Sequence, residues 1–392
     1  MSRVLAGPFA AQVLADLGAE VIKIEQPGKG DVTRRWGPPF HSDDAGRETG
    51  TAAYYYCANR GKKSVTVNLA VSAGQEIIRK LAVASDVLLE NFRTDKLAEY
   101  GLDYSTLQQH NPQLVYCSIT GFGHTGPYRE RPGYDLLIQA MAGVMSVTGS
   151  ADGPPLRAGI SIADLSAGLF AVIAIQGALL ERERSGLGQH IDLSLFDAQT
   201  AMLANQAAHY LVGGEVPGRL GSQHPNIVPY QAFATSEGYI ILAIASDEQF
   251  ARFAAVAGAA ELARDERFAT NAARVRNRAA TVSAVGDLLK QRPGAEWIEL
   301  LSAASIPAGP INNIAEVFDN PQVKARDMCL ELSDPVTGPV QLPGSPLHYS
   351  RSDSSAATTP PPAMGADTDS VLSDLLGLDK ERLTALRDKG VI

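Results

Sequence analysis

The sequence predicts an α/β fold in which helices cover a parallel β-sheet. In the first part of the chain, short runs of β-branched residues alternate with helical patterns, as they do in parallel sheets with crossover helices. The chain has 392 residues, of which 45% are hydrophobic, so it is long enough to bury a large core in more than one domain. Together these observations are typical of a globular enzyme or binding protein.

The elements of this sheet are predicted from the spacing of apolar residues and from the residues that end each run. They are helices over 8–17 and 72–84, and strands over 21–24, 65–67, 87–89 and 114–119. In such sheets, ligands bind at the carboxyl ends of the strands. Those ends are Glu25-Gln26, Glu90-Asn91-Phe92 and Thr120-Gly121-Phe122.

The rest of the chain predicts a long helix and then a second, smaller domain. An apolar helix runs from Asp164 to about Glu183. Its apolar stretch, 165–180, is short and interrupted by polar and small residues, which favours a buried helix over a membrane span. We also expect a strand over 190–194, a helix from Asp197, a loop over 213–230, strands over 231–235 and 238–245, helices up to Ala304, a surface crossing over 350–359 and a last helix near Asp379.

Charge and composition exclude several classes of partner. Lys and Arg number 34 against 43 Asp and Glu, and the formal net charge of −9 disfavours binding of duplex nucleic acid. The three cysteines fit no zinc motif and no disulfide framework, and no signal peptide precedes the first helix, so we expect a cytoplasmic protein. The histidines have no metal-ligand spacing, and we expect no metal.

Two segments near the start of the chain bear on phosphate binding. The first helix follows Leu5-Ala6-Gly7-Pro8-Phe9, which has one glycine where a nicotinamide site has G-x-G-x-x-G, so we expect no nucleotide cofactor. The basic run Asn59-Arg60-Gly61-Lys62-Lys63-Ser64 leaves two interpretations open, a solvated turn or a site that binds phosphates.

Asp164 is the candidate catalytic residue, at the boundary between an apolar segment and an apolar helix. One interpretation is a helix N-cap that accepts backbone N–H bonds, and the other is a carboxylate nucleophile. The two are compatible, because the positive end of the helix dipole favours an ionised carboxylate. His224, in a loop rich in Gly, Ser and Pro, is either a site residue or a surface residue. The sequence has no G-x-S-x-G motif, so it gives no sign of a serine hydrolase.

Several ordered segments along the chain point to a known family. In chain order they are residues 3–8, 16–25, 30–31, 59–64, 90–93, 121–127 and 133–135, and Asp164 with the helix that ends at Gly186-Leu187-Gly188-Gln189. This ordered set resembles the class III CoA-transferases, also called the CaiB–BaiF or formyl-CoA transferase family. Within the family, residues 221–233 are most similar to the branch that transfers CoA between succinate and glutarate or hydroxymethylglutarate.

The resemblance implies a Rossmann-like, parallel-sheet large domain built from both termini, a smaller α+β domain and an interlocked homodimer. The expected boundaries are 1–200 for the first part of the large domain, 201–227 for a linker, 228–310 for the small domain, 311–345 for a second linker and 346–392 for the return to the large domain. In relatives, a short segment before Arg3 forms the first strand, and this sequence lacks it, so either the start codon is misassigned or the edge of the sheet is incomplete.

The resemblance also implies the chemistry. Asp164 matches the family's catalytic aspartate, which attacks an acyl-CoA donor, expected to be succinyl-CoA, and forms an aspartyl–acyl anhydride and then an aspartyl-CoA thioester. The expected acceptor is a dicarboxylate such as glutarate or hydroxymethylglutarate, and no membrane partner is expected. The expected CoA-binding residues are Val4, Leu5, Ala6, Ala58, Asn59, Arg60, Lys62, Lys63, Asn91, Phe92, Arg93 and Tyr134, and the expected substrate-lining residues are His124, Gln223, His224 and Asn226.

Two positions depart from the family pattern, and two alternative functions stay open. The family's glycine-rich loop maps to Gly221-Ser222-Gln223, which has one glycine, and Gln26 stands where formyl-CoA transferases have an arginine. An α-methylacyl-CoA racemase shares the fold but needs a histidine as its acid or base where this chain has Tyr134. A CoA-binding protein without catalysis is the other alternative.

Overall fold

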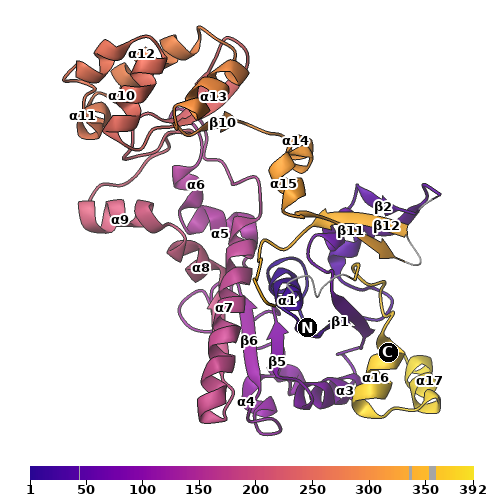
Figure 1. Cartoon of the computed structure of the whole chain (residues 1–392). Coiled ribbons are helices and arrows are strands. Elements are labelled where there is room, and N and C mark those ends of the chain that lie inside the picture. The colour runs from indigo at the N-terminus through magenta and orange to yellow at the C-terminus, as the bar shows by residue number, and fades with distance from the viewer. Residues whose placement is uncertain (44, 335–337, 353–358) are drawn as a thin grey trace. The chain divides into compact units, whose positions relative to one another are not determined.

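The computed structural model describes residues 1–43, 45–334, 338–352 and 359–392 (Figure 1). The chain divides into two compact units. The first consists of residues 1–144, 157–208 and 321–392, and therefore contains both chain ends. The second consists of residues 145–156 and 209–320.

The first unit is built on two parallel sheets. Strand β1 (Val21–Glu25) pairs in parallel with β4 (Lys62–Thr66). Strands β5 (Val87–Glu90), β6 (Val115–Thr120) and β7 (His190–Ser194) form a second parallel sheet in that order (Figure 1). The mixed α/β fold with parallel strands is thus confirmed, although the predicted strand over 65–67 begins earlier, at Lys62.

Helices cover these sheets because their apolar residues recur on one face. Helix α3 (Ser72–Val83) buries Ile77, Ile78 and Leu81 beside Leu88 of β5. Helices α1 (Ala6–Asp16), α7 (Ile162–Ser185) and α8 (Leu195–Ala201) share a second core with β6. Where α1 meets α7, a Cβ on Gly168 would lie 2.9 Å from the carbonyl oxygen of Ala6, so only glycine permits this close approach.

Helix α7 begins earlier than the sequence predicts. Ser161 is its N-cap residue, and Asp164 lies inside the first turn, so the prediction of Asp164 as the N-cap is wrong. The apolar residues before Asp164 are good enough helix formers to extend the helix. By length and composition alone α7 is able to cross a membrane. In the structure, its residues Ala167, Ala171 and Ile175 are buried in the core that it shares with α1.

Several short elements of the first unit were not predicted, and most of them lie in connections. They are the hairpin β2 (Phe40–Ser42) and β3 (Glu48–Ala52), the hairpin β11 (Cys329–Asp334) and β12 (Gly338–Pro343), helices α2 (Ala53–Tyr56), α4 (Tyr104–Leu107), α5 (Asp135–Met141), α15 (Pro321–Ala325) and α16 (Thr368–Leu376), and the 3-10 turns η1 (Val32–Arg35) and η2 (Ala98–Tyr100). The last helix, α17 (Lys380–Asp388), is capped by Asp379, close to the predicted start. Of the predicted crossing over 350–359, residues 353–358 lie outside the described residues.

The second unit contains an antiparallel sheet in the order β10 (Ala308–Pro310), β9 (Tyr239–Ala243), β8 (Tyr230–Ala234), which includes the predicted strand pair. Its helices are α10 (Asp247–Val256), α11 (Asn271–Arg276), α12 (Arg278–Leu289), α13 (Gly294–Ala303) and α14 (Ile314–Asp319), with the turn η3 (Ala260–Arg264). Phe250, Phe253 and Trp297 pack at the centre of its core. Two helices, α6 (Val144–Val147) and α9 (Ala204–Gly213), lie where the chain passes from one unit to the other.

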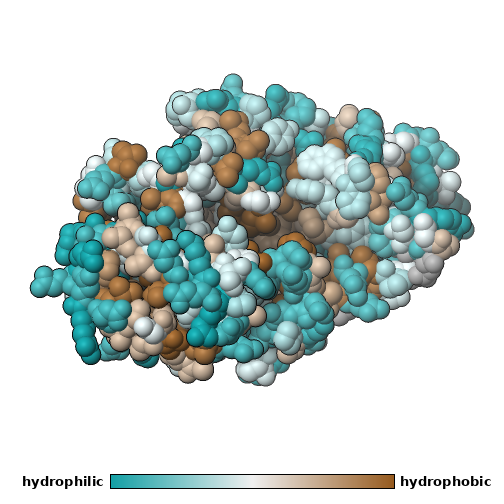
Figure 2. Space-filling model, turned by 90° about the horizontal axis from the view of Figure 1, so that it is seen from above, coloured by the Kyte–Doolittle hydropathy of each residue, from teal (hydrophilic) through white to brown (hydrophobic). Residues whose placement is uncertain are grey.

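Part of the apolar surface stays exposed. Figure 2 shows brown apolar residues among the teal hydrophilic ones on the face in view. On α7, Leu169, Ile173 and Leu180 are among the exposed large apolar side chains. They recur at helical spacing, so one face of α7 is apolar and exposed while the opposite face is buried.

Candidate active site

The side chain of Asp164 lies partly buried in the first turn of α7. Burial, and to a smaller extent the negative charge of Asp135, raise the pKa of the Asp164 carboxyl to about 7. Burial and the like charge therefore oppose the ionised form that the helix dipole favours. A carboxyl with such a pKa exchanges between its acid and its carboxylate near neutral pH.

Asp135 holds the segment that leads into α7. Its Oδ1 accepts a hydrogen bond from the backbone N–H of Ala163 at 3.0 Å, and its Oδ2 accepts one from Nε2 of Gln139 at 2.7 Å. Oε1 of Gln139 in turn accepts the N–H of Ala158 at 2.8 Å. Asp135 and Gln139 are both buried, whereas their neighbour Tyr134 is 70% exposed. This buried pair thus ties the start of α7 to α5 and fixes the position of Asp164.

The face of α7 that carries Asp164 meets the start of α1. Gly168, one turn after Asp164, is the residue that approaches the carbonyl of Ala6, and residues four apart lie on the same helix face. The N-cap residue of α1, Leu5, makes no side-chain hydrogen bond, so the first N–H groups of α1 have no side-chain cap. Free N–H groups at a helix start favour an anion nearby. Asp164 therefore lies on the face of α7 that packs against the start of α1, where negative charge is favoured.

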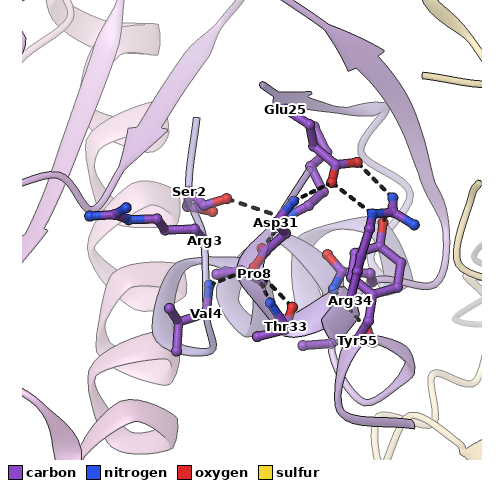
Figure 3. A network of polar contacts seen from close by, with 12 residues as sticks. Ser2, Arg3, Val4, Pro8, Glu25, Asp31, Thr33, Arg34 and Tyr55 are labelled. Atoms are coloured by element: carbon purple, nitrogen blue, oxygen red, sulfur yellow. Dashed lines mark hydrogen bonds and ion pairs between the residues drawn. The ribbon is translucent and has the colours of Figure 1, made fainter. Parts of the chain in front are cut away.

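A buried network at the end of β1 shapes the turn before α1 (Figure 3). Glu25 accepts hydrogen bonds from Nε and Nη2 of Arg34 at 2.9 and 2.7 Å, and from the N–H of Asp31 at 2.8 Å. Asp31 accepts hydrogen bonds from Lys23 at 2.8 Å and from the N–H of Val4 at 3.3 Å. Val4 has φ of 68°, which is rare for a β-branched residue and needs such a constraint.

The network is ionised despite its burial. Burial by itself would raise the pKa of Glu25, but its hydrogen bonds with Arg34 and the charge of Arg34 lower it below the usual range. Burial likewise opposes the ionisation of Asp31, and the nearby Lys23 lowers its pKa. Both carboxylates therefore stay charged at neutral pH. Asp31 accepts the N–H of Val4, and its partner Lys23 donates to the carbonyl of Ser2.

A pocket of about 290 Å³ opens beside this turn, at the carboxyl ends of β1, β4 and β5. Arg3 and Lys96 bring positive charge to its lining, and Phe92 and Tyr100 bring aromatic rings. Of the predicted CoA-binding residues, Phe92 lines this pocket, and Asn91 supports it through two hydrogen bonds with the backbone of Arg3. Lining residues that the sequence analysis did not single out are Asn68, Leu69, Ala70 and Tyr100. For Asn68, Leu69 and Ala70, the position just after the predicted strand over 65–67 was the available signal.

Most of the predicted basic run is used inside the fold. Lys62 is buried, and its Nζ donates to the carbonyls of Pro8 and Ala58 at 2.7 and 2.6 Å and to Oδ1 of Asn59 at 3.0 Å. Burial sets the pKa of Lys62 well below its usual value. Arg60 is buried in an ion pair with Asp16, and Lys63 pairs with Glu20 at the surface. A role of this run in binding CoA stays a prediction.

The remaining predicted residues lie in different parts of the chain. Val4, Leu5 and Ala6 form the turn into α1, Arg93 is exposed after β5, and His124 lies in the loop after β6. The N–H of His124 donates to the carboxylate of Asp192, and its Nε2 is buried with no hydrogen-bond partner among the described residues.

Gln223, His224 and Asn226 share one loop of the second unit. The guanidinium of Arg278 holds this loop by donating to Oε1 of Gln223 at 3.4 Å and to the carbonyls of His224 and Pro225 at 3.0 and 2.5 Å. Nδ1 of His224 accepts the N–H of Asn226 at 3.1 Å, so the neutral ring carries its proton on Nε2. Over residues 1–43, 45–334, 338–352 and 359–392, no group of three or more His, Cys, Asp or Glu is placed to hold a metal ion.

Comparison with known proteins gives a consistent result over the whole chain. A family model described as "CoA-transferase family III" matches residues 1–368. The chain is 44% identical to a succinate–glutarate CoA-transferase of Agrobacterium fabrum, over 97% of this chain and 94% of that protein. It is 40% identical to the human succinyl-CoA:glutarate CoA-transferase, over 100% of this chain and 88% of that protein.

Solved structures agree with these relatives. A CAIB/BAIF family protein from Brucella suis is 46% identical and superposes with a TM-score of 0.84, covering 96% of this chain and 97% of that one. Rv3272 from Mycobacterium tuberculosis is 31% identical and superposes with a TM-score of 0.81, covering 93% of this chain and 94% of that one.

Proposed function

The chain belongs to CoA-transferase family III, and on that premise we propose that it moves CoA from succinyl-CoA to glutarate or a related dicarboxylate such as hydroxymethylglutarate. The observation that carries the proposal is the partly buried carboxyl of Asp164, in the first turn of α7 and on the face that meets the start of α1. Relatives of 40–44% identity named for succinate and glutarate support this choice of substrates.

The reaction proceeds through two kinds of covalent intermediate on Asp164. Its carboxylate attacks the thioester carbonyl of succinyl-CoA, releases CoA thiolate and forms an aspartyl–succinyl anhydride. The thiolate then attacks the aspartyl carbonyl, which releases succinate and leaves an aspartyl-CoA thioester. The acceptor carboxylate attacks this thioester to form a second anhydride, and CoA thiolate attacks its acyl carbonyl, which gives the new acyl-CoA and frees Asp164. The thioester's free energy is conserved throughout.

The electrostatics of the site favour these intermediates. The ionised carboxyl of Asp164 is destabilised by burial and by the charge of Asp135. An anhydride or thioester at Asp164 is neutral, so acylation removes the charge that the site disfavours. The start of α1 instead favours negative charge. Its N–H groups stabilise the charge that develops on the attacked carbonyl oxygen or the charge that the CoA phosphates carry.

CoA binds in this proposal along the pocket beside the first turn. Arg3 and Lys96 pair with its phosphates, and Phe92 and Tyr100 offer aromatic surface to its adenine. The pantetheine arm then runs past Val4, Leu5 and Ala6 toward Asp164. The backbone there is preorganised, because the hydrogen bond from Val4 to Asp31 holds its unusual conformation.

The acceptor's distal carboxylate needs donors, and Gln223, His224 and Asn226 supply candidates. Oε1 of Gln223 is held by Arg278, which leaves its Nε2 as a donor, and His224 carries its proton on Nε2. We also propose a cytoplasmic homodimer without metal, in which the exposed apolar face of α7 is covered by a second copy.

The proposal is tested by a transfer assay read by mass spectrometry. Succinyl-CoA is mixed with glutarate, hydroxymethylglutarate, citramalate, mesaconate or a monocarboxylate, and the new acyl-CoA species are recorded. We expect glutaryl-CoA and no product from the monocarboxylate. In parallel, hydroxylamine should inactivate the enzyme in the presence of succinyl-CoA, with a hydroxamate on Asp164. Inactivation without an acyl-CoA donor, or modification of another residue, contradicts the covalent mechanism.

A further inference from the structure

Two arginines near the junction of α11 and α12 hold the loop that precedes β8. Nε of Arg274 donates to the carbonyl of Val228 at 2.7 Å. The guanidinium of Arg278 donates to the carbonyls of His224, at 3.0 Å, and of Pro225. All of these residues belong to the second unit. Both arginine side chains therefore bind backbone oxygens of one loop and fix it at two points.

The two arginines differ in how their charge is compensated. Arg274 is fully buried, and its Nη2 forms an ion pair with Oδ1 of Asp247 at 2.8 Å. Arg278 is half-buried, and among the described residues no carboxylate lies within ion-pair distance of its guanidinium. Burial lowers the pKa of Arg278, but an arginine stays protonated in a folded protein. A partly buried cation without a counter-ion favours an anion beside it.

Two side chains of the same loop carry hydrogen-bond donors next to this charge. Oε1 of Gln223 accepts from Nη1 of Arg278 at 3.4 Å, which leaves Nε2 of Gln223 as a donor. Nδ1 of His224 accepts the N–H of Asn226 at 3.1 Å, so the neutral ring carries its proton on Nε2. The backbone N–H of His224 also donates to the carbonyl of Tyr230 at 3.0 Å, which fixes the residue further. In the described part of the chain, neither Nε2 donates to another residue.

We propose that Arg278 makes the protein selective for dicarboxylate acceptors, because its charge and the Nε2 donors of Gln223 and His224 together bind the acceptor's distal carboxylate. The inference rests on the proposed function, which assigns these two side chains to the acceptor. Arg278 is a positioning residue, since its guanidinium donates to the loop, holds the loop in place and adds a positive charge beside the two donors. An acceptor with one carboxylate leaves the charge and both donors unpaired, so the site binds it weakly.

The first test measures binding without turnover, on Asp164→Asn with CoA present. Calorimetry gives the Kd for glutarate and for pentanoate, which has the same chain length but a single carboxylate. We expect glutarate to bind at least about tenfold more tightly than pentanoate. Adding Arg278→Met, which keeps an unbranched side chain without the charge, should raise the Kd for glutarate by about tenfold or more and that for pentanoate by less than about twofold.

The second test measures turnover in variants of the otherwise unchanged protein. Arg278→Met should raise the KM for glutarate by about tenfold or more and change kcat by less than about threefold. Arg278→Lys keeps the charge but loses the planar fork, so it should recover at least about threefold of that rise in KM. Arg276→Met is the matched control, because Arg276 is exposed in the same segment and loses the same charge. Its KM for glutarate should change by less than about twofold.

Three results overturn the inference. They are an equal rise in KM for Arg276→Met, which shows that net charge acts, no recovery in Arg278→Lys, and an equal loss of pentanoate binding, which shows a general disturbance of the loop.

The proposed function is judged separately. If the wild type forms glutaryl-CoA and Arg278→Met leaves the KM and the Kd for glutarate unchanged, the proposed function stands and this inference is wrong. If the wild type transfers CoA to no dicarboxylate but glutarate binding depends on Arg278, the proposed function is wrong and the assignment of Arg278 to a dicarboxylate site stands.

Discussion

Oδ1 of Asp135 accepts a hydrogen bond of 3.0 Å from the backbone N–H of Ala163, the residue that precedes Asp164. Through this bond Asp135 sets the position of Asp164, the proposed nucleophile, and its charge adds to the effect of burial in raising the pKa of Asp164. Position and reactivity of Asp164 thus depend on one buried side chain that makes no covalent intermediate. Five predictions concern this arrangement and its surroundings.

Replacing the proposed nucleophile, Asp164, should remove transfer and leave CoA binding intact. In Asp164→Asn, the amide is a poor nucleophile of nearly the same size, so we expect at least about a thousandfold loss of glutaryl-CoA formation. The pocket proposed for CoA is formed by other residues, so the CoA dissociation constant, measured by calorimetry, should change by less than about threefold. Retained turnover contradicts the role given to Asp164.

Stability should depend on pH through the same carboxyl. The folded-state pKa of Asp164, about 7, lies above its unfolded value. At a pH between these two pKa values, the folded protein keeps a proton on Asp164 that the unfolded protein has released. The stabilisation from Asp164 is therefore complete below the unfolded pKa and is lost as the pH rises through 7. Allowing for partial exposure of this group, we expect roughly 2 kcal/mol more loss of stability between pH 5 and 8 in the wild type than in Asp164→Asn. Urea unfolding at both pH values measures this difference in the free energy of unfolding. An equal loss in the wild type and in Asp164→Asn would contradict the raised pKa.

Two substitutions at Asp135 should separate its charge from its hydrogen bond. Asp135→Asn keeps an acceptor for the N–H of Ala163 but removes the charge, so the acid limb of the activity profile should move to lower pH. Asp135→Ala leaves that N–H without its acceptor and should lower the free energy of unfolding by about 1–2 kcal/mol. The checks are a pH–rate profile and urea unfolding. An unchanged acid limb in Asp135→Asn shows that Asp135 does not set the pKa of Asp164.

Two glycines of α7 should respond in opposite ways to the same substitution. A Cβ on Gly168 meets the carbonyl of Ala6 at 2.9 Å, so Gly168→Ala should push α1 from α7, lower stability by about 1–3 kcal/mol and reduce kcat. A Cβ on Gly177 meets nothing within 4 Å, so Gly177→Ala should stabilise the helix by about 0.5–1 kcal/mol with unchanged kcat. Thermal unfolding and the transfer assay compare the pair. If both variants show the same change in thermal stability and in kcat, the close approach of α1 to α7 at Gly168 is not needed for stability or activity.

Two cations of the pocket should affect CoA binding. Arg3→Ala and Lys96→Ala each remove a charge from the pocket lining, so we expect the KM for succinyl-CoA to rise about tenfold with less effect on kcat. The effect should weaken as salt is added. Lys80→Ala is the matched control, because Lys80 is an exposed residue of α3 outside this pocket. A similar rise in KM for the control would show that total charge, and not the pocket, acts.

Local patterns predicted the elements well because they depend on neighbouring residues. The helix that became α3 and the strand β7 lie where apolar spacing and end residues placed them. The family membership and the enzyme class are also confirmed, since they rest on the order of short motifs along the chain. The start of α7 was misplaced, because a helix extends into any neighbouring segment whose tertiary contacts favour it.

The features that the sequence did not reveal all join distant segments. Asp135 was part of a recognised motif, but its bond to Ala163 spans 28 positions of the chain. Lys62 belonged to a charged run expected at the surface or at a phosphate, and its three hydrogen bonds bury it instead against Pro8 and residues 58–59. Charge runs are usually solvated, and only the fold shows when backbone carbonyls replace the water.

The sequence by itself determined the fold class, the family and the residue that matches the family's nucleophile, because each is encoded in local periodicity or in an ordered set of motifs. The tertiary structure decided the pKa of Asp164 and the lining of the pocket beside Arg3. These depend on burial and on the distance between charges, and both arise only when segments far apart in the chain come within contact of one another.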